Sequence, residues 1–190
     1  MPNKSFSLNI NHKIKPFVKS IKVDSDKSLS IRSFLISSIS QNISITRNVL
    51  ESEDIFSTID CLKKLGVQIK KVKPKKYCIH GKGLGSLFAK KNSKLNFGNS
   101  GTLARLLIGI LSTTPDIEVK VQGDSSLNKR SMQKLILQMS EFGAEFLPKN
   151  KFKFPLKLIS TEMPIGINYK AGVSAQLKSA VILAGLNSYG

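Results

Sequence analysis

The chain has 190 residues, 41% of them hydrophobic, which suffices for one sizeable domain or two small ones and excludes a disordered chain. No apolar run reaches the roughly 20 residues that cross a bilayer, and the first residues lack the apolar stretch of a secretory signal, so we expect a soluble, unprocessed, cytoplasmic protein. The formal charge of +18, from 30 basic and 12 acidic residues, favours an anionic ligand.

The first third of the chain predicts two helices. One should begin near residue 27, where polar residues precede apolar ones at the helical spacing i, i+3 and i+4. An amphipathic helix is expected from residue 53, ended by Gly66 and followed by a short alternating strand. Cys61 lies in that helix pattern and Cys78 in a short apolar run, so we expect both to pack in the core, without a disulfide framework or a zinc site.

The rest of the chain predicts the same succession, a buried helix followed by an amphipathic helix and strands. A second buried helix is predicted near residue 100, and a strand at 117–122. An amphipathic helix ended by a glycine and followed by a strand is expected within 130–146, with another strand at 153–159. A third buried helix should begin near residue 173.

The three buried helices belong to an internal repeat. DKSLSIRSFLISSI, NSGTLARLLIGILS and GVSAQLKSAVILAG begin at residues 26, 99 and 172, a gapless spacing of 73 residues. In each, a small residue precedes a cation by four positions; the pairs are Ser28 with Arg32, Gly101 with Arg105, and Ser174 with Lys178. A period this long is typical of a small α+β subdomain present in several copies, and not of a solenoid.

The repeat predicts an anion site. Helix N-termini present free N–H groups and roughly half a positive charge. If the units pack around a pseudo-threefold axis, the three helix starts converge together with Lys27 and the repeated cations. Such a site suits one or two substrates with several negative charges. The alternative is that each cation only caps or pairs locally. We expect no metal and no cofactor, because the motifs hold no His, Cys or carboxylate cluster at ligand spacing.

Four segments, in order, resemble the motifs of the 5-enolpyruvylshikimate-3-phosphate (EPSP) synthases over nearly the whole chain. They are DKSLSIR at 26–32, GNSGTLARLL at 98–107, GDSSLNKRSM at 123–132 and VSAQLKSAVILAGL at 173–186. Asp24 and Ser25 stand where that family usually has Pro-Gly, and Ser131 where it has proline, which affects loop rigidity more than chemistry.

The resemblance implies transfer of the enolpyruvyl group of phosphoenolpyruvate to the 5-hydroxyl of shikimate 3-phosphate, with release of phosphate. This reaction of chorismate biosynthesis is the target of the phosphoenolpyruvate mimic glyphosate. The implied fold is α+β, an inside-out α/β barrel of βαβαββ units around a pseudo-threefold axis. Residues 1–22 would be the opening strand segment of a first domain, and 23–190 most of a second, with the third repeat incomplete.

Members of this family are more than twice as long, with two domains and a site in the cleft between them. The resemblance therefore implies that further arginines and the proton-transferring carboxylates lie in a part absent here, so we expect little or no turnover from this chain alone. We expect a monomer for a full-length enzyme. Five carboxylates near the first motif are interpreted as helix caps or surface residues: Asp24, Asp26, Glu51, Glu53 and Asp54.

Residue roles carry over from the motifs. Lys27 would contact both substrates and is the candidate catalytic residue. The residues expected to hold shikimate 3-phosphate are Lys27, Ser28, Arg32, Ser174, the backbone of Ala175, and Gln176. Those expected to hold phosphoenolpyruvate are Lys27, Asn99, Gly101, Arg130 and Gln176. Arg105 and Lys178 are expected to support them.

Three alternatives remain. A UDP-N-acetylglucosamine enolpyruvyl transferase would be expected to carry a cysteine in the loop that reads GDSSLNKR and a Lys-Asn pair in place of Lys27-Ser28, and both are absent. A basic nucleic-acid-binding module accounts for the charge, but the lysines are not interleaved with base-stacking aromatics, so we expect no nucleic-acid partner. A noncatalytic fragment that binds small anions differs from the enzyme only in lacking the other domain.

Overall fold

The computed structural model describes residues 23–188, together with residues 7–9, 11–13, 15–16, 18, 20 and 21. Half of residues 1–22, where the opening strand is expected, lie outside the described residues. In chain order the elements are α1 (Lys27–Ile39), β1 (Ile43–Arg47), α2 (Glu53–Lys64), β2 (Gln68–Lys73), β3 (Lys76–His80), β4 (Lys94–Asn96), α3 (Gly101–Ser112), β5 (Glu118–Gln122), the 3-10 turn η1 (Leu127–Lys129), α4 (Gln133–Glu141), β6 (Glu145–Leu147), β7 (Leu156–Ile159) and α5 (Ala175–Asn187). Within these described residues, no helix has the length and apolar character needed to cross a membrane.

The strands form two sheets whose topology shows the repeat. One sheet has the order β1-β3-β2 and is antiparallel throughout. The other has the order β4-β5-β7-β6, in which β4 and β5 are parallel and the remaining pairs antiparallel. The segment from β4 to β7 is therefore a complete βαβαββ unit, and α1 to β3 repeats it from its first helix onward. The predicted α+β fold of repeated units is confirmed, and α5 is the equivalent of the first helix, α1 and α3, of these units.

The first helix of each unit begins where the sequence places it, because a polar side chain caps it. Asp26 Oδ1 accepts from the backbone N–H of Leu29 at 2.7 Å. Ser100 Oγ caps α3 and Ser174 Oγ caps α5 in the same way, each accepting from the N–H three residues later. Each cap satisfies one of the helix's otherwise free N–H groups. The amphipathic helices end as expected at Gly66 and Gly143, whose φ angles of 85° and 108° favour glycine.

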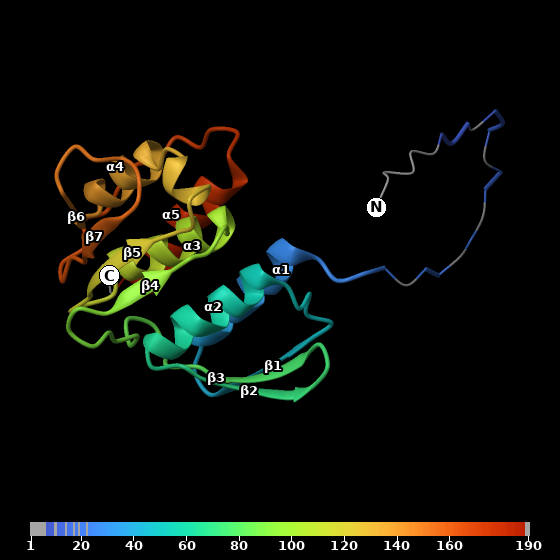
Figure 1. Cartoon of the computed structure of the whole chain (residues 1–190), viewed down its shortest axis with the longest axis horizontal. Helices are drawn as coiled ribbons and strands as arrows, with labels where there is room; N and C mark the ends of the chain where they lie inside the picture. The colour runs from blue at the N-terminus through green and yellow to red at the C-terminus, as the bar shows by residue number, and fades with distance from the viewer. Residues whose placement is uncertain are drawn as a thin grey trace.

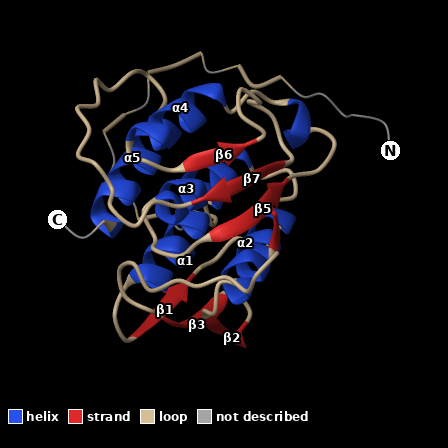
Figure 2. Cartoon of the chain, turned by 90° about the vertical axis from the view of Figure 1, so that its left-hand side faces the viewer, coloured by secondary structure: helices blue, strands red, loops and turns tan. Residues whose placement is uncertain are grey.

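Helix α3 is the centre of the core. Ten of its twelve residues are buried, as expected for a helix that is apolar all round. It packs against both α1 and α5, while α1 and α2 cover one face of the β1-β3-β2 sheet (Figure 1). Seen from the side, strands β5, β7 and β6 lie over α3, so this central helix is covered by the sheet (Figure 2). Gly109 lets α3 approach α5 closely, because an added Cβ would lie 2.5 Å from the carbonyl oxygen of Ala180.

Two local predictions need correction. The strand predicted at 153–159 begins only at Leu156, after a cis peptide bond between Phe154 and Pro155. Cys61 is fully buried as predicted, and burial raises the pKa of its thiol to about 12. Cys78 is only half-buried, because the alternation of β3 turns Tyr77 and Ile79 to the core and Cys78 to the outer face.

Candidate functional site

The three helix starts of the repeat converge on one polar cavity, as predicted, and the start of α2 joins them. The cavity has a volume of about 280 Å³ and is lined by Lys27, Asp54, Asn99, Gly101, Thr102, Arg105, Arg130 and Gln176. Lys27 opens α1, Asp54 lies in the first turn of α2, Gly101 and Thr102 open α3, and Gln176 lies in the first turn of α5. The combined helix-terminal charge and three basic side chains make this a positive cavity.

Arg105 connects the second and third units. Its Nη1 donates to Gln176 Oε1 at 2.9 Å and to the carbonyl oxygen of Gly101 at 3.0 Å. The amide of Gln176 in turn donates to Thr102 Oγ1 at 3.0 Å. Burial, and secondarily the nearby Arg130 guanidinium, lower the pKa of Arg105 from its usual value. A cation that is partly desolvated without a carboxylate partner is favourably placed to bind an anion.

Arg130 is oriented from the other side of the cavity. It follows η1, and its Nη2 donates to Asn99 Oδ1 at 2.7 Å and to Ser126 Oγ at 3.3 Å. Asn99 Nδ2 donates to Asp124 Oδ2 at 3.0 Å, so Asn99 joins the two motifs. The amide therefore positions the guanidinium without neutralising it, which leaves the charge available to a ligand.

Gly101 lies between the two arginines. A Cβ at this position would be 2.8 Å from Arg105 Nη1 and 3.5 Å from Arg130 Nη1. The missing side chain lets both guanidinium groups lie close to the start of α3, where one anion could contact them and the helix N–H groups together.

The expectation that Asp54 is a helix cap or a surface residue was wrong. Its Oδ2 is 3.1 Å from Lys27 Nζ, and the side chains are 16% and 52% exposed respectively. Asp54 is thus the carboxylate of the cavity and holds the lysine at its edge, whereas Asp26 is a helix cap, as predicted. The one signal in the sequence was its place in the first turn of a helix, a position typical of surface carboxylates as well.

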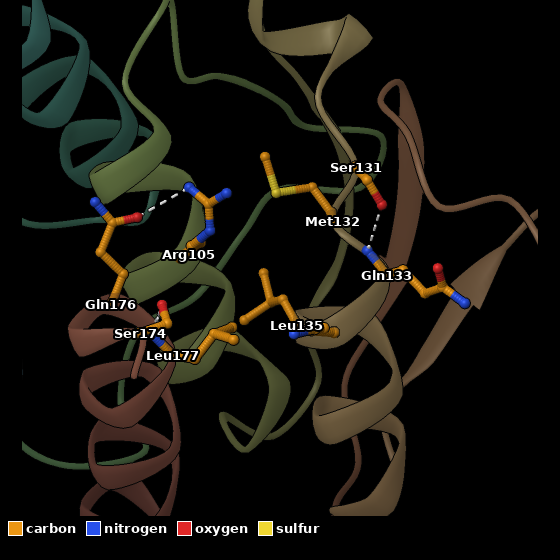
Figure 3. A pocket seen from close by; sticks show the side chains of 9 residues that line it. Arg105, Ser131, Met132, Gln133, Leu135, Ser174, Gln176 and Leu177 are labelled. Carbon is orange, nitrogen blue, oxygen red and sulfur yellow. Dashed lines mark hydrogen bonds between the residues drawn. The ribbon is translucent and has the colours of Figure 1, made fainter. Parts of the chain in front are cut away.

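A second cavity adjoins the first (Figure 3) and shares Arg105 and Gln176 with it. Its volume is about 390 Å³, and the other lining residues are Ser131, Met132, Gln133, Lys134, Leu135, Ser174 and Leu177. In Figure 3, Gln176 and Arg105 lie on one side and Ser131, Met132 and Gln133 on the other. The residues between Ser131 and Leu135 were not among those predicted. Their closeness to the third motif was a signal, but the loop alone did not show which way they point.

The remaining predicted residues lie beside these cavities. Arg32 is half-buried and donates from Nη2 to Ser179 Oγ at 3.3 Å and from Nη1 to the carbonyl oxygen of Ser28 at 3.4 Å. It therefore connects α1 to the start of α5. Ser28, Arg32 and Ala175 line neither of the two cavities, while Ser174 both caps α5 and lines the second.

Lys178 is not brought to the site, although it repeats Arg32 and Arg105 in the sequence. It is exposed and lines neither cavity. The helix caps are spaced by 74 residues, one more than the sequence repeat, so the three cations fall at the sixth, fifth and fourth positions after their caps. One position turns a side chain by about 100° around the helix axis, which directs each cation differently.

Comparison with known proteins gives a consistent result. Residues 11–190 match the family model described as EPSP synthase (3-phosphoshikimate 1-carboxyvinyltransferase). A 3-phosphoshikimate 1-carboxyvinyltransferase of Alkaliphilus oremlandii is 41% identical over 94% of this chain and 42% of its own length. One from Zymomonas mobilis is 36% identical over 95% and 40% respectively. The solved EPSP synthase from Acinetobacter baumannii matches with a TM-score of 0.81 and 34% identity, covering 90% of this chain and 39% of that one. The chain thus spans about 40% of the length of these curated relatives.

Proposed function

We propose, because the chain belongs to the EPSP synthase (3-phosphoshikimate 1-carboxyvinyltransferase) family, that it supplies one side of an active site which transfers enolpyruvyl from phosphoenolpyruvate to shikimate 3-phosphate. The observation that carries this proposal is the convergence of Lys27, Arg105 and Arg130 with the helix starts on one cavity. The relatives named above are 3-phosphoshikimate 1-carboxyvinyltransferases. We also propose that residues 23–190 are most of one of two domains.

In this proposal phosphoenolpyruvate occupies the 280 Å³ cavity. Arg130 and Lys27 contact its charged groups, and the free N–H groups at Gly101 approach them from the start of α3. Shikimate 3-phosphate lies beside it at the start of α5, with its phosphate near Ser174 and the backbone of Ala175, and with Ser28 and Arg32 on the opposite side. Gln176 lines both cavities and so separates the two ligands.

The reaction explains why fixed cations are needed. The 5-hydroxyl oxygen adds to C2 of phosphoenolpyruvate as C3 gains a proton and the hydroxyl proton leaves. The tetrahedral intermediate then loses phosphate from C2 and a proton from C3, which restores the double bond. Two phosphates and two carboxylates must approach one another, and their repulsion is offset by oriented cations and helix N-termini. Lys27, paired with Asp54, is our candidate for a proton-transferring group on this side of the site.

Calorimetry on the 190-residue chain tests the substrate assignment. Arg32→Ala should weaken binding of shikimate 3-phosphate about tenfold or more, because it removes a charge-assisted contact. Arg130→Ala should do the same for phosphoenolpyruvate. Lys153→Ala is the control, since it also removes one positive charge and Lys153 is exposed and lines neither cavity. Equal losses in all three variants would show that the ligands sense only net charge, and would overturn the assignment.

Turnover is a separate test. We expect phosphate release by the isolated chain to stay at the background level, because the relatives named above are more than twice as long. Family-like steady-state turnover by the 190 residues alone would contradict the proposal that a second domain completes the site.

A further inference from the structure

The outer face of the β1-β3-β2 sheet carries a row of like charges. Arg47 in β1 is paired with Lys76 in β3, and Lys76 is paired on its other side with Lys73 in β2. Tyr77 and Ile79 face the core, so Lys76 points outward, and Arg47 and Lys73 are both exposed. Side chains at such cross-strand positions have their Cβ atoms about 5 Å apart, and like charges directly opposite one another are unfavourable.

These cations lie around a cavity of their own. It has a volume of about 560 Å³ and is lined by Arg47, Asn48, Lys73, Pro74, Lys75 and Lys76. The turn between β2 and β3 is held against the end of β1, because Val49 N–H donates to the carbonyl oxygen of Lys75 at 3.1 Å. The cavity shares no lining residue with the two cavities of the candidate site.

The neighbouring carboxylate does not neutralise the row. Glu51 Oε1 accepts from Tyr77 Oη at 2.8 Å and from the backbone N–H of Lys75 at 3.1 Å, and it pairs with Lys71 Nζ at 2.9 Å. Lys71 is opposite Tyr77, so this pair lies on the inner side of the sheet. In the described part of the chain, no salt bridge involves Arg47, Lys73, Lys75 or Lys76.

We propose that the cavity lined by Arg47, Lys73, Lys75 and Lys76 is a second anion site, separate from the candidate active site, which binds a small polyphosphate through its chain of phosphate groups. Four unpaired cations around one hollow match a ligand with several closely spaced negative charges. The lining has no aromatic side chain on which a base could stack, which disfavours single-stranded nucleic acid as the occupant.

The test is titration of the 190-residue chain with inorganic tripolyphosphate, followed by calorimetry and by thermal shift. Lys73→Gln combined with Lys76→Gln should weaken binding about tenfold, because two direct charge contacts are lost. Lys149→Gln combined with Lys153→Gln is the matched control. It removes the same charge from two exposed lysines outside this cavity and should change affinity by less than about twofold.

The melting temperature without ligand distinguishes a loss of binding from a loss of folding. The Lys73, Lys76 double variant relieves cross-strand repulsion, so its melting temperature without ligand should equal or exceed that of the parent chain. Its stabilisation by tripolyphosphate should fall, while that of the Lys149, Lys153 control should not. Comparable binding of ATP and tripolyphosphate would support recognition of the phosphate chain alone. The proposal is overturned by non-saturable binding, by equal losses in both double variants, or by tighter, length-dependent binding of an oligonucleotide through the same lysines.

Discussion

Replacing Gly101 with alanine should separate ligand affinity from stability. The added methyl group would lie 2.8 Å from Arg105 Nη1, closer than a carbon and a nitrogen can approach without displacement. Arg105 is a flexible side chain and can move, but its Nη1 holds Gln176 and the carbonyl oxygen of Gly101. Arg105 also lines the cavity proposed for phosphoenolpyruvate, and loss of a charge-assisted contact between its guanidinium and that ligand is worth about 1.5–3 kcal/mol of binding free energy. We therefore expect phosphoenolpyruvate, and its mimic glyphosate, to bind about 10- to 100-fold more weakly.

The same substitution should not unfold the protein. Gly101 is the first residue of α3 and does not adopt the left-handed backbone conformation, so alanine is compatible with its backbone. Alanine in a helix is favoured over glycine by up to about 1 kcal/mol. Gly185→Ala is the matched control, because Gly185 lies in α5 and an added Cβ meets nothing within 4 Å.

The assay is calorimetric titration of phosphoenolpyruvate with shikimate 3-phosphate present, alongside thermal melts of the parent and both variants. We expect Gly101→Ala to lose affinity with only a small change in melting temperature, because the helix preference of alanine offsets part of the cost of moving Arg105. Gly185→Ala should keep its affinity at an equal or higher melting temperature. Equal affinities for the two variants would refute the placement of the ligand against Gly101. A melting temperature lowered by more than about 10 °C would exceed the cost of moving Arg105 and would refute the reasoning about the backbone of Gly101.

Three further predictions concern stability. Gly109→Ala should lower the free energy of unfolding, measured in urea, by about 1–3 kcal/mol, because the added Cβ would meet backbone atoms of Ala180, which have no rotamer to move to. An unchanged unfolding midpoint would contradict the close contact between α3 and α5. Asn187→Ala should cost about 2–4 kcal/mol, because the buried amide donates to Thr114 Oγ1 at 2.9 Å and to a carbonyl oxygen of α3; a loss below 1 kcal/mol would count against that network. Hydrogen bonds from Lys71, from Tyr77 and from the backbone of Lys75 lower the pKa of Glu51 from an ordinary 4.5 to about 2. The stability that the ionised carboxylate adds to the fold is therefore present above pH 4.5 and is lost as the pH falls towards 2. Glu51→Gln should therefore lower the melting temperature at pH 7 but not at pH 2, and a pH-independent difference would contradict this.

Much of the local structure could be predicted from the sequence. Helices begin after Asp26, Ser100 and Ser174 because capping and apolar periodicity act within a few residues. Gly66 and Gly143 end helices because each adopts a backbone conformation that other residues rarely reach. The motifs were equally informative about Lys27, Gly101 and Arg130, which all line one cavity.

What only the tertiary structure decided is which side chains meet across units. Asp54 contacts Lys27 because α1 and α2 pack side by side, although the two residues are far apart in sequence. Arg105 reaches Gln176 while Lys178 points to solvent, although both cations occupy equivalent repeat positions. The physical reason is that a local pattern sets where a helix begins and which face is apolar. The rotation of that helix about its own axis is set by packing against its neighbours, and one residue of shift redirects a side chain by about 100°.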